Sequence, residues 1–254
     1  MFPLVDFWRL GLLAGNVSSW VAAAGVDGET DVTDMLLTMA INVLETTSPS
    51  PRSLILTTLR LLANGFANQS LARHLLDPTL KASRLRHSSR QNVTDLLVPT
   101  LLHADAPVRT AAASLAFNIA AHYQRPLVEA QRNGKRGDPV ADNESDGQGD
   151  WEVEIVSAVV EALAREKQSE DVGEYVPYAR RSPCGRCTIV HRLTASLALF
   201  LHLSPYWAQL SSFVEVLQVK DLLCSKLQPG GCGERGVQKK EVQILLREVI
   251  TMCS

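Results

Sequence analysis

Large apolar residues recur every three or four positions along almost the whole chain, and this spacing constrains the fold more than any other feature. The stretch SLILTTLRLLANGFANQS at 53–70 is typical, because its apolar side chains fall on one face of a helix. The alternation of apolar and polar residues that marks β-strands is nearly absent. The chain is therefore predicted to be all-α.

The same spacing predicts a series of short helices separated by brief irregular segments. These helices are too short for a long coiled coil and too numerous for a simple four-helix bundle. A globular helical pack and an α-solenoid remain as alternatives. The predicted helices lie near 3–14, 31–46, 52–64, 67–76, 91–103, 107–122, 151–165, 188–202, 206–216, 218–226 and 238–252.

Two of these helices resemble one another. VRTAAASLAF at 108–117 and VHRLTASLAL at 190–199 share an A-S-L-A core and an arginine near the start, Arg109 and Arg192. The two segments lie 82 residues apart, close to two armadillo or HEAT units of about 40–47 residues each. This repetition favours an armadillo-like α-solenoid, a superhelix of stacked helices.

Two segments lack the helical pattern. Residues 131–150 are rich in Gly, Asp and Asn and hold almost no large apolar residue, and residues 166–186 are of mixed character. Helices of the same kind resume after each of them. We therefore predict a single domain over residues 1–254 with mobile insertions near 131–150 and 166–186.

Polar residues stand one helical turn apart inside the apolar run at 53–70, at Arg60 and Asn64. A guanidinium can bind a carboxylate through two parallel hydrogen bonds, and an amide offers both a donor and an acceptor to a peptide backbone. A polar face repeated on stacked helices is therefore a candidate peptide groove. A polar network between repeats, with no ligand, is an equally open interpretation.

The formal net charge of −2 provides no overall attraction to nucleic acid or to an anionic membrane. No uninterrupted apolar run reaches the ~18 residues that span a bilayer. The N-terminal stretch MFPLVDFWRLGLL does not read as a signal peptide, because Asp6 and Arg9 interrupt it. We expect a monomeric, soluble protein of the cytoplasm and nucleus that binds neither nucleic acid nor membranes.

The five cysteines suit free thiols in a reducing compartment. Cys184 and Cys187 form a C-x-x-C, but Cys224 and Cys232 are a poor second pair for a zinc site. We expect no metal and no cofactor. No phosphate-binding loop, G-x-S-x-G or H-E-x-x-H motif is present, so catalysis is not expected. A thiol hydrolase built on these cysteines with His191 remains an alternative.

The order LRLLANGFANQS, VRTAAASLAFNIAAH and VHRLTASLALFLHL resembles the PUL domain, the C-terminal armadillo-like module of phospholipase-A2-activating protein and of fungal PPPDE/thioredoxin/PUL proteins. The R-x-L-x-N-x-F helix of that family is matched by Arg60, Leu62, Asn64 and Phe66, and its A-x-L-A-x-N helix ends at Asn118. Its F-R-L helix is matched more loosely, because His191 replaces the phenylalanine before Arg192.

The resemblance implies a non-catalytic module that binds the acidic C-terminal tail of the hexameric AAA ATPase valosin-containing protein in a basic groove, as an adaptor in ubiquitin-dependent processing. That tail carries an aromatic residue near its end. A general armadillo-type scaffold for another protein, or part of a thiol isopeptidase protein with its catalytic domain outside this chain, are the alternatives. The predicted peptide-binding residues are Arg60, Asn64, Arg109, Asn118 and Arg192.

Overall fold

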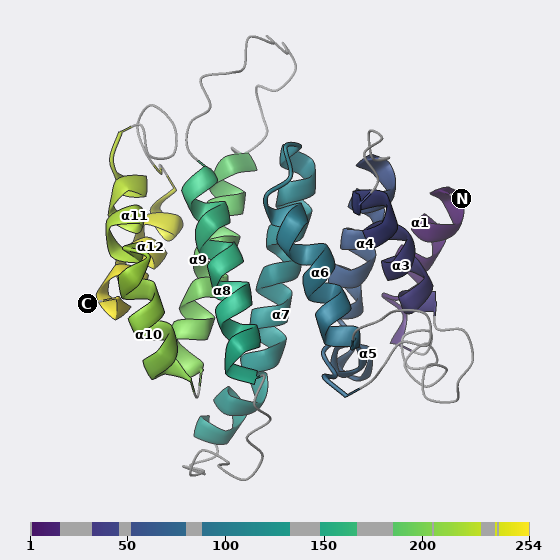
Figure 1. Cartoon of the computed structure of the whole chain (residues 1–254), viewed down its shortest axis with the longest axis horizontal. Helices are drawn as coiled ribbons and strands as arrows, with labels where there is room; N and C mark the ends of the chain where they lie inside the picture. Colours follow the sequence, from purple (N-terminus) through teal and green to yellow (C-terminus); the bar gives the residue numbers. More distant parts are fainter. Residues whose placement is uncertain are drawn as a thin grey trace. The chain divides into compact units, whose positions relative to one another are not determined.

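The computed structural model describes residues 2–15, 32–45, 52–79, 88–132, 148–166, 185–204, 206–229, 237 and 239–253. The regular elements of these residues are α-helices (Figure 1). They are α1 (Phe2–Gly11), α3 (Val32–Glu45), α4 (Arg52–Gly65), α5 (Gln69–Leu75), α6 (Ser89–Leu101), α7 (Ala106–Arg132), α8 (Gln148–Arg165), α9 (Gly185–Leu203), α10 (Trp207–Val216), α11 (Val219–Leu227) and α12 (Lys240–Met252). The predicted all-α fold class is confirmed, and helices stacked on one another agree with an armadillo-like solenoid.

Most predicted helices match the observed ones to within a few residues, and the clearest difference lies in α7. This helix was expected to stop near residue 122 but continues to Arg132. The added segment consists mainly of good helix formers, and the first glycine after it is Gly134. Both edges of the first predicted insertion, at 131–132 and 148–150, and the last residues of the second, at 185–186, are therefore helical. Residues 133–147 and 167–184 lie outside the described residues.

The chain divides into two compact units, Met1–Ile119 and Ala120–Ser254, with the boundary inside α7. Each unit has its own buried apolar residues, so each can be described by itself. The prediction of a single domain over the whole chain stays a prediction.

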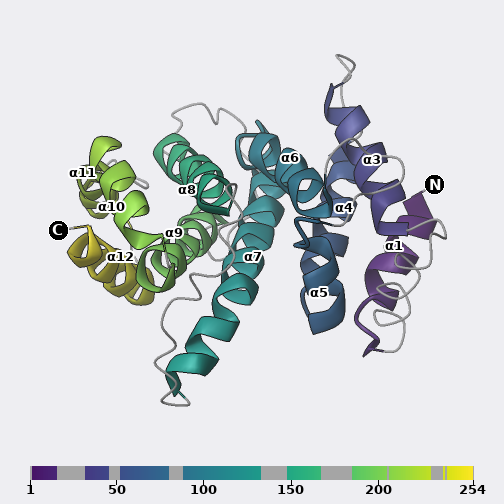
Figure 2. The ribbon, with the colours of Figure 1, turned by 60° about the horizontal axis from the view of Figure 1, so that its bottom comes forward.

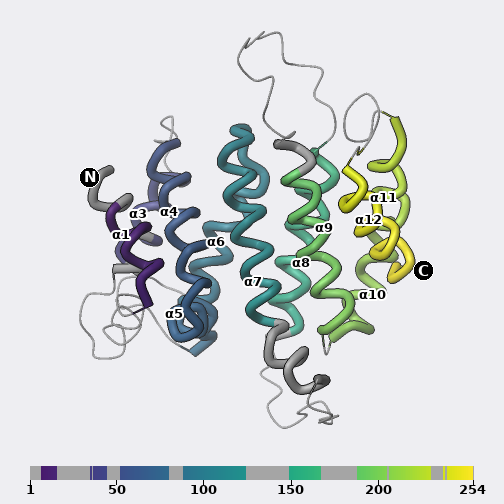
Figure 3. Tube along the Cα trace, turned by 180° about the vertical axis from the view of Figure 1, so that it is seen from behind, coloured from purple at the N-terminus to yellow at the C-terminus, as the bar shows by residue number. Residues whose placement is uncertain are grey.

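In the first unit, α1 packs on α4, while α3 packs on both α4 and α6. Figure 3 shows α1 and α4 as neighbours in one layer. The interior between the helices is filled by leucine and isoleucine side chains that are almost fully buried. They include Leu37, Ile55, Leu59, Leu62, Leu96 and Leu97.

Gly65 ends α4 where the chain turns into α5. A Cβ atom at this position would lie 3.3 Å from side-chain atoms of both Leu71 and Leu75. The glycine therefore lets α5 approach the end of α4 closely. Asn68 then caps α5, because its side-chain oxygen accepts the backbone N–H groups of Ser70 and Leu71 at 3.0 and 3.1 Å.

In the second unit, α9 is the central helix, since α8, α10 and α12 all pack against it. Figure 2 shows α8 and α9 side by side. An aromatic cluster holds this packing together: the ring of Trp151 lies edge-on to Tyr123 and Phe200, with centroids 5.4 and 6.4 Å apart.

A fully buried carboxylate, Glu152, lies beside the aromatic cluster. The hydroxyl of Tyr123 donates to its Oε1 at 2.7 Å, and the hydroxyl of Ser204 donates to its Oε2. Two O–H donors thus compensate the lost hydration of the carboxylate. The backbone N–H of Tyr206 donates to Ser204 Oγ at 3.0 Å, which orients that hydroxyl.

Candidate peptide-binding surface

Four of the five predicted binding residues lie in the first unit: Arg60, Asn64, Arg109 and Asn118. Arg192 lies in the second unit, on α9. These residues differ in their contacts. Some of the side chains bind other parts of the same chain, and one is open to solvent.

Arg60 is exposed on α4, and it makes no hydrogen bond or ion pair with any residue that the structure describes. Its neighbours Leu59 and Leu61 are buried, so the backbone at this position is held by the core. The sequence left open whether Arg60 pairs with an internal carboxylate. The structure places its guanidinium in solvent instead.

Asn64 connects α4 to α1. Its Nδ2 donates to the backbone oxygen of Arg9 at 2.8 Å. That oxygen lies at the end of α1, where the N–H of Leu13 bonds to the oxygen of Leu10 at 3.1 Å rather than to that of Arg9. Because the last carbonyls of a helix lack intrahelical partners, Asn64 acts as a cap supplied by the neighbouring helix.

Asn118 repeats this contact between α7 and α4. Its Nδ2 donates to the backbone oxygen of Ala63 at 3.0 Å. At the end of α4, the N–H of Ala67 bonds to the oxygen of Asn64 at 3.0 Å, which leaves the oxygen of Ala63 to the amide. Each asparagine thus caps the helix that lies before it in the layer.

The two amide bonds define a register for α1, α4 and α7. Each joins a donor to an acceptor 55 residues earlier in the sequence, Asn64 to Arg9 and Asn118 to Ala63, so the same offset relates the two acceptors and the two donors. Arg9 is therefore equivalent to Ala63, and Asn64 is equivalent to Asn118. The helices α1 and α4 also end at glycines in this register, at residues 11 and 65. These contacts match the inter-repeat polar network that the sequence left open, and a peptide-binding role for either asparagine stays a prediction.

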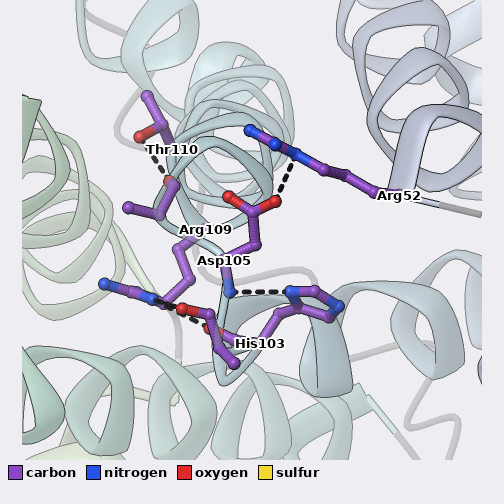
Figure 4. Close-up of polar contacts among 7 residues, drawn as sticks. Arg52, His103, Asp105, Arg109 and Thr110 are labelled. Carbon is purple, nitrogen blue, oxygen red and sulfur yellow. Dashed lines mark hydrogen bonds and ion pairs between the residues drawn. The ribbon is translucent and has the colours of Figure 1, made fainter. Parts of the chain in front are cut away.

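Arg109 binds the loop between α6 and α7. Its Nη1 donates to the backbone oxygens of His103 and Ala104 at 2.9 and 2.7 Å (Figure 4). The backbone N–H of Asp105 donates to Nδ1 of His103 at 3.0 Å, so this loop is fixed from two sides. The guanidinium of Arg109 therefore has a structural role at this turn.

An ion pair that the sequence did not suggest joins the beginnings of α4 and α7. The guanidinium of Arg52, the first residue of α4, contacts the carboxylate of Asp105 just before α7 (Figure 4). The Asn118 amide joins the same two helices near residue 63. The first turn of α4 thus contacts the beginning of α7, and a later turn of α4 contacts a later turn of α7. The two helices therefore run parallel and in register.

This register places two exposed side chains on adjoining helices. Phe117, which is 36% exposed on α7, is equivalent to Ala63 on α4, one turn beyond Arg60. Ser114 is the α7 residue equivalent to Arg60. Its hydroxyl donates to the backbone oxygen of Thr110 in the same helix at 2.7 Å. We call Arg60 and Phe117 the α4–α7 surface. Sequence analysis missed Phe117, although a single aromatic residue after the mostly small residues A-A-A-S-L-A was a usable signal.

Arg192 is half-buried on α9. Its backbone oxygen accepts a hydrogen bond from Ser196 Oγ at 2.8 Å, and Ser196 is fully buried. Ser196, one turn after Arg192, therefore points into the interior of the second unit, because a hydroxyl bonded to its own helix can be buried at little cost.

The predicted thiol pair is not described: Cys184 and the side chain of Cys187 lie outside the part of the chain that the structure describes. In the second unit, His202 and Cys253 line a pocket of about 400 Å³ together with Leu201, Trp207, Ser211, Val214 and Met252. Burial raises the pKa of the Cys253 thiol, and Lys220 lowers it only in part. Nucleophilic thiols have lowered pKa values, so this pocket does not favour thiol catalysis.

Within the described ranges, no group of three or more His, Cys, Asp or Glu side chains is arranged to hold a metal ion. No described helix combines the length and the apolar character needed to cross a bilayer.

The family model of the PUL domain matches residues 1–174, which include the whole first unit and all of α7 and α8. No curated protein and no solved structure matches the chain. With most of its length matched by this model and with an all-α fold, the chain belongs to the PUL domain family of helical protein-interaction modules.

Proposed function

We propose that this PUL domain binds the acidic C-terminal tail of the AAA ATPase valosin-containing protein, and that it acts as a non-catalytic adaptor in ubiquitin-dependent processing in the cytoplasm and nucleus. The observation that carries the proposal is the exposed guanidinium of Arg60, which no described residue neutralises. Among the four predicted residues of the first unit, Arg60 is the one whose side chain has no such contact.

The chemistry of the α4–α7 surface suits such a tail. A guanidinium offers a planar set of donors that matches a carboxylate, and charge-assisted hydrogen bonds are about twice as strong as neutral ones. Phe117 adds an exposed aromatic ring on the adjoining helix, and the tail carries an aromatic residue near its end. The Arg52–Asp105 pair and the Asn118 amide hold the two helices in register, so the surface is organised before binding.

Fluorescence anisotropy with a labelled, acidic, tyrosine-containing C-terminal peptide tests the proposal. Arg60→Asp should weaken binding at least tenfold, because a charge-assisted hydrogen bond contributes about 1.5–3 kcal/mol and the introduced carboxylate repels the tail. The fold should be unaffected, since Arg60 is exposed. Arg192→Asp tests the second predicted arginine in the same way.

Arg73→Asp is the matched control, because Arg73 is an exposed arginine of the same unit on α5. It changes the net charge of the chain equally and should alter the affinity only slightly at physiological ionic strength. An unchanged affinity in Arg60→Asp would contradict the assignment of the surface. No binding of the peptide at tens of micromolar would remove this partner and favour a scaffold for another protein.

A further inference from the structure

Arg9 lies on the side of α1 that faces α4. In the register of the layer, it is equivalent to Ala63 on α4. Ala63 follows Arg52 by about three turns, so the two share one side of α4, and the ion pair of Arg52 with Asp105 shows that this side faces α7. The equivalent side of α1 therefore faces α4, in agreement with the half-burial of Arg9.

Arg60 borders the boundary between α1 and α4 from the other side. It stands one turn before Asn64, whose amide reaches the backbone oxygen of Arg9, so both α4 side chains lie toward α1. The Nδ2 of Asn68 also donates to α1, at the backbone oxygen of Gly15 at 3.4 Å, so the two helices run parallel. Arg9 and Arg60 therefore lie within about one helical turn of each other on neighbouring helices (Figure 3).

We call Arg9 and Arg60 the two-arginine site. Arg60 is exposed, and α4 contains no acidic residue that could balance its charge from the same helix. The guanidinium of Arg9 has five N–H donors, so it can keep a contact within the chain and still bind a ligand. Two guanidinium groups held this close together repel one another and raise the local positive potential. An anion bound between them relieves this repulsion.

We propose that the two-arginine site binds two carboxylates of one extended acidic peptide, and that the spacing of these carboxylates determines the affinity. This assignment rests on the proposed function, because the peptide is the acidic tail assigned there. In an extended chain, side chains two residues apart lie on the same side at roughly 7 Å, whereas adjacent side chains point to opposite sides. Carboxylates separated by one residue therefore suit two arginines that converge from neighbouring helices, and adjacent carboxylates do not.

Fluorescence anisotropy with the full chain and two labelled, tyrosine-containing peptides of equal net charge tests the proposal. One peptide carries Asp-Asn-Asp and the other Asp-Asp-Asn at the same place. The unmodified chain should bind the first about fivefold more tightly, since one more charge-assisted hydrogen bond forms. Arg9→Gln should remove this preference and leave weaker binding through Arg60. Arg9→Lys should keep part of it, because lysine retains the charge but not the planar set of donors.

Arg73→Gln is the matched control, because it removes one positive charge from the exposed side of α5 in the same unit and should keep the preference. Equal affinities of the two peptides for the unmodified chain overturn the two-arginine site, and this comparison does not depend on the stability of any variant. A preference that persists in Arg9→Gln, or an equal loss in Arg73→Gln, overturns it too. In these cases acidic peptides still bind and the proposed function stands. If neither peptide binds at tens of micromolar, the proposed function fails, and the two-arginine site fails with it.

Discussion

Replacing Asn118 with alanine should destabilise the first unit, because it removes the donor that caps the end of α4. The amide reaches the backbone oxygen of Ala63 at 3.0 Å, and the N–H of Ala67, which would bond to this oxygen in a continued helix, bonds to the oxygen of Asn64 instead. The substitution keeps helix propensity high, so any loss reports the contact between helices and not the conformation of α7.

The expected loss combines two effects. A net hydrogen bond contributes about 0.5–1.5 kcal/mol, and an unsatisfied carbonyl costs about 1–3 kcal/mol when water cannot reach it. Because Asn118 is half-buried, water recovers part of this second cost. We therefore expect a loss of about 1–2 kcal/mol in the free energy of unfolding, or a fall of about 0.5–1 M in the urea midpoint for a typical m-value.

Urea unfolding followed by circular dichroism measures this loss, and hydrogen exchange locates it. Amides near the end of α4 should exchange faster in Asn118→Ala, while those of α9 in the second unit should not change. Gln91→Ala is the control, because it removes a 3.1 Å amide–carboxylate bond to Asp95 within α6 that should contribute only about 0.2–0.5 kcal/mol.

Asn118→Asp sharpens the test because it preserves the shape of the side chain. At neutral pH the introduced carboxylate has no donor and faces the oxygen of Ala63, so the loss should equal or exceed that of Asn118→Ala. The capping interpretation is refuted if Asn118→Asp is as stable as the unmodified chain, or if Asn118→Ala shifts the midpoint no more than Gln91→Ala.

Two further predictions concern the second unit. Tyr123→Phe should keep the aromatic packing but leave Glu152 Oε1 without its hydroxyl donor, lowering the free energy of unfolding by about 1–3 kcal/mol; an unchanged urea midpoint would contradict this. The raised pKa of Cys253 should make its alkylation by iodoacetamide at pH 8 slower than that of a solvent-exposed thiol, because less thiolate is present. Since Lys220 lowers this pKa, Lys220→Gln should slow the reaction further; peptide mass spectrometry would detect the opposite change.

The helices could be predicted because their signal is local. Apolar spacing of three and four residues identified α4 from Arg52 almost to Gly65, and the family resemblance followed from short motifs such as that around Asn118. The extension of α7 to Arg132 was missed because residues 123–132 carry no continuous apolar stripe and include Pro126, which normally marks the end of a helix. The motifs placed Arg60, Asn64 and Asn118 on helices, but they did not show what these side chains contact.

By itself, the sequence determined that this chain is all-α, where most helices begin and end, and that it carries PUL-type motifs, because these properties depend on neighbours a few residues apart. The tertiary structure alone decided that Asn64 and Asn118 bind backbone of their own chain, that Arg109 fixes a loop, and that Arg60 is open to solvent. An amide or guanidinium accepts partners from any distance in sequence, so only the packing of α1, α4 and α7 could assign them.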